Sequence, residues 1–248
     1  MPSKESPPLL SPSSPPPFTL QGLRAGIVGA RTLVPSVTMY GIAFGVMAAA
    51  TGLKVWEAVA ISAWVNAGSA QMATLQAWAD PIPLLAVCLT TLAMNARYLL
   101  LGAALRPWFA GLPAYQSYPS LFVLGDANWA LALREHADGR NDAAFLLGSG
   151  IVLWFVWVGS TAAGYVFGQA LGDPRKFGVD FMLAAFFATM AVAFFRRAGG
   201  IAPLVVGMVT AIVIERMAPG PWYILGGALA GSLVGALRPD EGQPDHAA

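Results

Sequence analysis

The sequence predicts an all-α polytopic membrane protein with about seven to eight transmembrane helices. Hydrophobic residues make up 56% of the 248-residue chain and charged residues only 11%. A soluble domain carries about 25% charged residues. Mean hydropathy is +0.61. Polar turns separate seven apolar segments that we interpret as spans of a ~30 Å hydrocarbon core, and an eighth segment is shorter.

The domain organisation follows from composition. Pro and Ser dominate residues 1–20, which predicts a disordered tail without the apolar core of a secretory signal. A polar tail covers residues 239–248, and one transmembrane helical domain is expected over residues 21–238. Its apolar segments run up to residue 50 and then over residues 56–78, 84–105, 121–133 (the short one), 143–171, 178–195, 201–214 and 222–237.

Residues 56–78 carry unusual polarity at mid-membrane depth. On a regular helix Ser62, Asn66, Ser69 and Gln76 would share one face. Unpaired polar groups in hydrocarbon cost several kcal/mol each, so this face must meet protein or water. Two interpretations remain open. Small and polar residues could join neighbouring helices, or a helix broken at residues 66–71 could open its backbone to a substrate.

The short segment 121–133 decides the topology. If it crosses and the N-terminus is cytoplasmic, eight Lys and Arg residues lie inside and five outside, with Arg97 left out. If it does not cross, the counts are six and seven. Apolar segments of this length are often re-entrant or buried. The positive-inside rule nevertheless favours a crossing, which would make the polar loop at residues 134–142 cytoplasmic.

Arg97 lies near the middle of the third apolar segment. An intramembrane charge usually pairs with another charge or lines a cavity. A guanidinium can hold a substrate carboxylate through two parallel hydrogen bonds. The alternative is a structural ion pair with Asp126 or Asp180. Asp126 could instead carry a proton for coupled transport.

Several classes of function are disfavoured. The chain has no HExxH, GxSxG or Walker A pattern, so we expect no enzyme activity and no cofactor. A single cysteine, Cys88, excludes an internal disulfide and a CxxC metal site. His136 and His246 are far apart in sequence and in polar surroundings, which argues against a metal site. The net charge of +1 gives no indication of nucleic-acid binding.

Four short motifs resemble one family. They are Ala67-Gly68-Ser69-Ala70-Gln71, Asn95-Ala96-Arg97-Tyr98, Gly125-Asp126-Ala127 and Gly178-Val179-Asp180-Phe181. In order and spacing they are similar to motifs of the AzlC family, the large subunit of branched-chain amino acid exporters. The chain departs from the family pattern in four places, where it has Asn66, Tyr98, Gly125 and Ala127 for an apolar residue, His, Thr and Glu.

The resemblance implies a multi-pass subunit of a bacterial inner membrane. With a small AzlD-like membrane subunit, it would export branched-chain or other small hydrophobic amino acids. The expected substrate-binding residues are Asn66, Gly68, Ser69, Gln71, Asn95, Arg97 and Asp126. Alternatives are a channel-like or structural membrane subunit and a membrane-embedded enzyme.

Glycines suggest where helices pack closely. Gly41 and Gly45 are spaced like Gly164 and Gly168, which is either chance or the trace of an internal repeat. In the last span, small residues suit contact with a partner subunit. They are Gly226, Gly227, Ala230, Gly231 and Gly235.

Overall fold

The computed structural model describes residues 17–76, 78, 82, 84–170, 201–217 and 222–237. Every regular element in these residues is a helix, which confirms the all-α fold class. The span expected from Gly178 onward, with Asp180, lies outside the described residues, as do residues 1–16 and 238–248 of the two tails.

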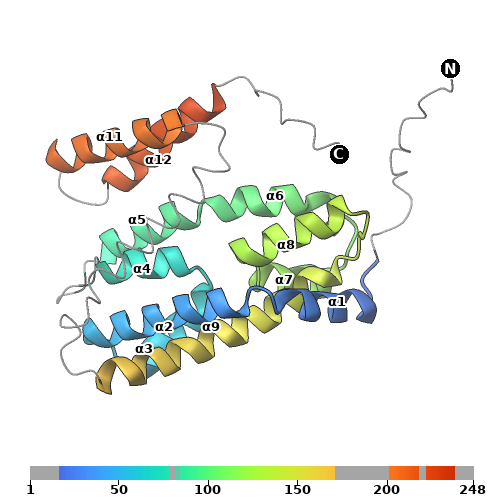
Figure 1. Cartoon of the computed structure of the whole chain (residues 1–248). Helices are drawn as coiled ribbons and strands as arrows, with labels where there is room; N and C mark the ends of the chain where they lie inside the picture. The colour runs from blue at the N-terminus through green and yellow to red at the C-terminus, as the bar shows by residue number, and fades with distance from the viewer. Residues whose placement is uncertain are drawn as a thin grey trace.

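The helices follow the chain in the order drawn in Figure 1. They are α1 (Leu20–Ala30), α2 (Val34–Ala50), α3 (Val55–Val65), α4 (Gly68–Gln76), α5 (Leu84–Asn95), α6 (Arg97–Phe109), α7 (Ala114–Phe122), α8 (Asp126–Ala137), α9 (Ala144–Ala170), α11 (Ile201–Met217) and α12 (Trp222–Ala236). A single turn residue, Ala96, separates α5 from α6. A bend of 66° separates α1 from α2.

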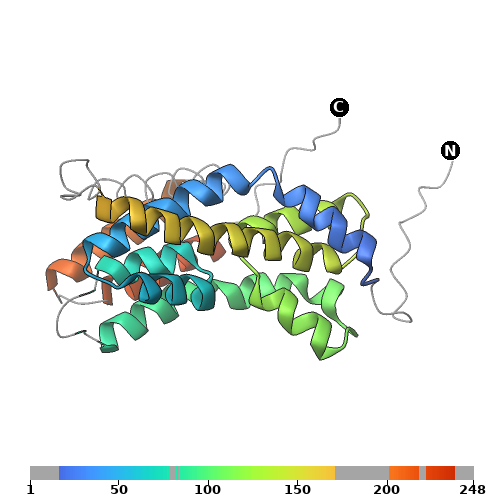
Figure 2. The same ribbon diagram turned by 90° about the horizontal axis from the view of Figure 1, so that it is seen from below.

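The long helix α9 is the axis of the fold, and α1 and α2 lie along it (Figure 2). A Cβ on Gly148 of α9 would overlap the backbone of Leu23 in α1, and one on Gly45 of α2 would overlap the backbone of Thr161. The later residue of the α1–α2 pair thus contacts the later residue of α9. The α1–α2 pair therefore runs parallel to α9.

The spaced glycines noticed in the sequence are a packing contact between α2 and α9. A Cβ on Gly164 would overlap the carbonyl oxygen of Ile42, and one on Gly168 would lie 3.0 Å from the Cα of Val46. Opposite them, a Cβ on Gly41 would overlap the Ser160 side chain. The two glycine pairs thus face one another, because only glycine lets the backbones approach this closely.

The starts of α1 and α9 are tied together. Thr19, the N-cap of α1, donates from its backbone N and from Oγ1 to the carboxylate of Asp142, at 3.2 and 2.5 Å. The backbone N of Ala143 donates to the carbonyl of Pro17 at 3.0 Å. Both helices therefore begin at the same end of the molecule.

Residues 56–78 do not form one helix, because the chain reverses at Asn66. Gln71 Nε2 in α4 donates to the carbonyl of Ile61 in α3 at 2.9 Å. Ten residues apart on a straight helix, these groups would be separated by about 15 Å. α3 and α4 therefore form a hairpin, with the break at residues 66–67 and residues 68–71 already helical.

The polar residues of this segment consequently do not share one face. Ser62 bonds Thr161 of α9 at 2.9 Å, while Ser69 accepts from Arg97 of α6. The side chain of Gln76 lies outside the described part of the chain. The single-face prediction is wrong because it assumed an unbroken helix.

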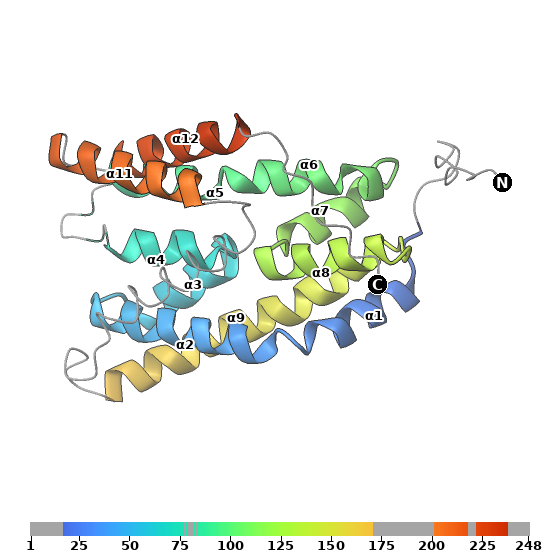
Figure 3. The same cartoon turned by 45° about the horizontal axis from the view of Figure 1, so that its top comes forward.

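α7 and α8 form a second hairpin, with its turn at residues 123–125 (Figure 3). α7 starts shortly after α6 ends. At the far end of α8, the ring of His136 stacks on Trp108 of α6 with centroids 3.9 Å apart. Both open ends of this hairpin thus lie beside the end of α6. His136 is 8% exposed, and it keeps polar neighbours in Glu135, Arg140 and Asn141.

Few helices are long enough to span a membrane by themselves. By length and composition, Val87–Phe109 and Ala144–Ala170 qualify in the described residues, and a third span exists if the bent α1–α2 pair is counted as one. The hairpins occupy two segments that the sequence suggested were crossings. The total of seven to eight spans stays a prediction.

α11 and α12 pack on each other through small residues, and α12 contacts α5. A Cβ on Gly227 would lie 2.8 Å from the carbonyl oxygen of Gly207, and one on Gly231 would lie 2.9 Å from that of Pro203. These glycines, expected to face a partner, are covered within the chain itself.

The close α2–α9 contact makes a stability prediction. Gly164→Ala should lower the thermal unfolding midpoint in detergent, because its Cβ overlaps Ile42 and such overpacking costs about 1–3 kcal/mol. Gly159→Ala is the matched control on the same helix, since a Cβ there meets nothing within 4 Å. An equal response of the two variants would contradict the contact.

Candidate functional site

A cavity of about 220 Å³ lies where the two hairpin turns meet α2, α6 and α9. This volume is below the ~300–1,000 Å³ typical of drug-sized ligands, so the cavity suits a small molecule. Its walls are largely apolar, and its polar groups gather at the hairpin turns. The lining residues are Val37, Tyr40, Asn66, Gly68, Ser69, Tyr98, Val123, Gly125, Asp126, Ala127, Asn128, Gly150, Leu153 and Trp157.

Arg97, the first residue of α6, connects the two hairpins. Its Nη2 lies 2.8 Å from Asp126 Oδ2, at the start of α8, and donates to Ser69 Oγ, at the start of α4, over 2.8 Å. Its guanidinium lies 5.4 Å from the centroid of the Tyr98 ring. The predicted ion pair with Asp126 is therefore present. Ser69 and Asp126 line the cavity. Arg97 contacts both of them but is not itself a lining residue.

The pair is reachable from solvent or substrate. The side chains of Arg97 and Asp126 are 24% and 46% exposed. Arg97 Nε has no hydrogen-bond partner among the described residues. This Nε is buried, so a ligand could use it as a donor only after the side chains around it move.

The turn of the first hairpin is strained and capped by side chains. Asn66 has a φ of +40°, in the left-handed region that residues other than glycine seldom occupy. Its carbonyl accepts from Tyr98 Oη at 3.4 Å, and its Nδ2 donates to the carbonyl of Leu124 at 3.5 Å. Near the end of α3, Trp154 Nε1 donates to the carbonyl of Ala63 at 2.9 Å. These bonds satisfy backbone groups that a helix end leaves without partners.

Asn128 braces the turn of the second hairpin. Its Oδ1 accepts from the backbone N of Gly125 at 2.7 Å, and its Nδ2 donates to the carbonyl of Val123 at 3.0 Å. The side chain is 1% exposed. These bonds of Asn128 fix the start of α8 and place Asp126 in its first turn, where the helix dipole favours a negative charge.

The residues expected at the site fall into three groups. Asn66, Gly68, Ser69 and Asp126 line the cavity, and Arg97 joins them through the contacts above. Gln71 is 1% exposed and holds α4 against α3. Asn95 lines a second cavity of about 420 Å³.

Sequence reasoning did not single out several lining residues. Asn128 has a local signal, because an Asn three residues after Gly125 can cap a helix start. Tyr40 and Trp157 have none, since aromatic residues in apolar spans are ordinary. Their place at the cavity depends on how α2 packs against α9.

Metal chemistry has no support in the described residues. No group of three or more His, Cys, Asp or Glu side chains there is arranged to hold an ion. The charged groups that meet at the cavity are one guanidinium and one carboxylate.

Interrupted helices that meet around a small, partly polar cavity define the class of this protein. With helices that are long and apolar enough to cross a membrane, this arrangement indicates an integral membrane protein.

The family model described as AzlC protein matches residues 32–171, which is more than half of the chain and includes every cavity-lining residue. The chain therefore belongs to the AzlC family. It is similar to the inner membrane protein YgaZ of Escherichia coli K12, with 27% identity over 244 residues, 94% of this chain and 99% of the relative. No solved structure matches the chain.

The left-handed turn at Asn66 makes a second stability prediction. Asn66→Ala should lower the unfolding midpoint. A residue other than glycine in the left-handed region costs about 1–3 kcal/mol, and alanine lacks the side-chain amide that bonds the Leu124 carbonyl. Asn66→Gly should be as stable as the parent or more so, since glycine adopts positive φ freely. Thermal unfolding in detergent checks both. An alanine variant as stable as the glycine variant would show that residue 66 does not need the left-handed conformation.

Proposed function

We propose that this protein is a transporter subunit that exports branched-chain or other small hydrophobic amino acids across the bacterial inner membrane. The observation that carries the proposal is the apolar cavity with the Arg97–Asp126 pair at its edge. Membership of the AzlC family and the inner-membrane relative support a transport-related membrane protein.

The charges of the pair match those of an amino acid zwitterion. A carboxylate bound near Arg97 and an ammonium bound at Asp126 would replace one ion pair by two, with no charge left alone in the membrane. A ligand with only a carboxylate or only an ammonium would leave one member of the pair unmatched. Zwitterions are therefore the preferred substrate class.

The start of α4 supplies further donors for a carboxylate. Gly68 and Ser69 line the cavity and belong to the first turn of α4. The backbone N–H groups of this turn have no acceptors within the helix. A helix start of this kind attracts anions. The apolar side chain of the substrate would then contact Val37, Leu153 and Trp157.

We further propose that a small AzlD-like membrane subunit completes the transporter. The support for this partner is family membership alone, because the glycine face of α12 already packs against α11.

Flux in proteoliposomes tests the function. Leucine, isoleucine and valine should be transported, while the α-keto acid and the amine of the same carbon skeleton should compete poorly. Reconstitution with and without the small subunit is part of the same measurement. Flux by the single chain would exclude an obligatory partner, and no amino acid flux in either preparation would favour a structural or channel-like subunit.

Three variants test the role of Arg97. Arg97→Lys should fold and yet transport at least ~10-fold more slowly, because lysine keeps the charge and loses the planar pair of donors. Arg97→Ala should lower membrane abundance by leaving Asp126 unpaired, and adding Asp126→Ala should restore abundance without restoring flux. Arg106→Lys on the exposed part of α6 is the matched control. Full flux by the double variant would remove the pair from the site.

The topology that we propose differs in detail from the sequence expectation. The hairpins α3–α4 and α7–α8 would enter the membrane from opposite sides and meet near its middle. Replacing two crossings by two hairpins leaves the N-terminus and the loop at residues 134–142 on the same side. The tie between Thr19 and Asp142 supports this arrangement.

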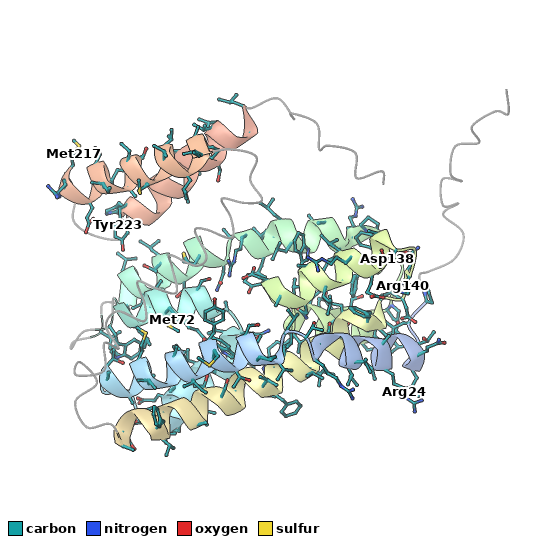
Figure 4. All side chains as sticks on the ribbon, viewed as in Figure 1. Arg24, Met72, Asp138, Arg140, Met217 and Tyr223 are labelled. Carbon is teal, nitrogen blue, oxygen red and sulfur yellow. The ribbon has the colours of Figure 1, made fainter. Side chains whose placement is uncertain are left out.

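The distribution of charge agrees with a cytoplasmic N-terminus. Seven Lys and Arg residues lie within 17–170, and we leave out Arg31, at the α1–α2 bend, and Arg97, at the cavity. On the proposed topology, four of the other five lie on the side of the N-terminus and one lies on the other side. The four are Arg24, Arg106, Arg134 and Arg140, and the one is Lys54. Figure 4 shows Arg24, Asp138 and Arg140 at one end of the molecule. Positive residues concentrate on cytoplasmic sides.

Single cysteines in a Cys88→Ala background test the hairpins. An impermeant thiol reagent should label Ala50→Cys and Ile82→Cys from outside intact cells, and Ala114→Cys and Ala137→Cys only after permeabilisation. All four positions are exposed. If α3–α4 crossed the membrane, Ala50→Cys and Ile82→Cys would label from opposite sides. Labelling of Ala137→Cys from outside would reverse the orientation.

A further inference from the structure

A second cavity adjoins the first and is not explained by the proposed substrate site. Its volume is about 420 Å³, nearly twice that of the first. It lies between the end of α3, the α5–α6 segment and the end of α7. Its lining is apolar except for Asn66, Asn95 and the Tyr98 hydroxyl.

Two residues are common to the walls of both cavities, Asn66 and Tyr98. They are joined by the hydrogen bond from Tyr98 Oη to the Asn66 carbonyl, which is 3.4 Å long. Asn66 reaches the second hairpin through a bond of 3.5 Å to Leu124. The partition is therefore one side chain and one backbone turn. Its hydrogen bonds are at the long limit of such contacts, and the Arg97 guanidinium lies 5.4 Å from the centroid of the Tyr98 ring.

Two features of Asn66 and Tyr98 would allow this partition to move. Asn66 occupies a left-handed conformation that residues other than glycine seldom adopt, so its present backbone geometry is strained. Tyr98 is a single side chain on α6, and a rotamer change would displace its ring without moving the helix. Neighbouring contacts at this hairpin are firmer: Ser62 bonds Thr161 at 2.9 Å, and Gln71 bonds Ile61 at 2.9 Å.

We propose that Tyr98 and Asn66 form a movable gate between the two cavities, and that the second cavity is the passage by which the substrate enters or leaves the first. This inference rests on the proposed amino acid transport. The same zwitterion would pass through, with its apolar part against Val65, Leu99 and Phe122 and its polar part against Asn95. Oδ1 of Asn95 is buried and has no hydrogen-bond partner among the described residues.

A thiol adduct placed in the passage tests the proposal. Gly102→Cys in a Cys88→Ala background introduces a thiol into the second cavity where a Cβ meets nothing within 4 Å. A bulky maleimide on this cysteine should reduce leucine flux at least ~10-fold, the loss expected when a route is filled, while leucine still raises the unfolding midpoint. Ala103→Cys, exposed on the same helix and outside the cavity, is the control and should transport normally when labelled.

The gate itself is tested by Tyr98→Phe, which keeps the ring and removes the hydroxyl bond to Asn66. Flux at saturating leucine should change by roughly 2- to 10-fold, the range that one weak hydrogen bond allows. Tyr118→Phe on the exposed surface of α7 should leave flux unchanged. Normal flux in labelled Gly102→Cys, or identical rates for Tyr98→Phe and Tyr118→Phe, would overturn the gate.

Different results would contradict the proposed transport function and the proposed passage. If the unlabelled protein neither binds nor transports leucine, the proposed function is wrong. If it binds and transports leucine but the adduct at Gly102→Cys has no effect, only the passage is wrong.

Discussion

The described part of the structure depends on backbone that is not helical at the centre of a helical protein. Two hairpin turns meet at the cavity, and each leaves peptide groups that hydrocarbon cannot satisfy. Arg97 holds the turns together through Ser69 and Asp126, while Asn128, Tyr98 and Trp154 bond the open backbone. Without these side chains the turns would carry unpaired groups at a cost of several kcal/mol each.

In our proposal, the ion pair of Arg97 with Asp126 that joins the two hairpins also selects the substrate. An ion pair in a partly apolar cavity is stable because its charges cancel, and any ligand must preserve that balance. Of the two sequence interpretations of Arg97, the ion pair with Asp126 is present in the structure. The carboxylate clamp is part of our proposal, and the two roles are compatible, because a zwitterion would replace the ion pair.

Much of the site could be predicted from the sequence, because charged and amide residues in apolar segments are costly and therefore conspicuous. Arg97, Asp126, Asn66 and Ser69 were all found this way, and they do come together. The path of the chain was harder to predict. A hairpin of two short helices has nearly the same composition as one long span. The bond between Gln71 and Ile61 that joins the two helices is not visible in the periodicity of the sequence. The spaced glycines were visible in the sequence. That they face one another depends on how α2 packs against α9, which the sequence pattern does not reveal.

The parallel contact of α2 with α9 has a consequence for biogenesis. Gly45 and Gly164 lie 119 residues apart in the chain. At a synthesis rate of about 5–20 residues per second, the first helix pair waits roughly 6–24 s before its partner is made. During that interval its glycine face has no complementary surface from α9. Early insertion must therefore proceed with this face covered by lipid, the translocation machinery or another protein, and the N-terminal helices reach their final packing only after the middle of the chain has entered the membrane.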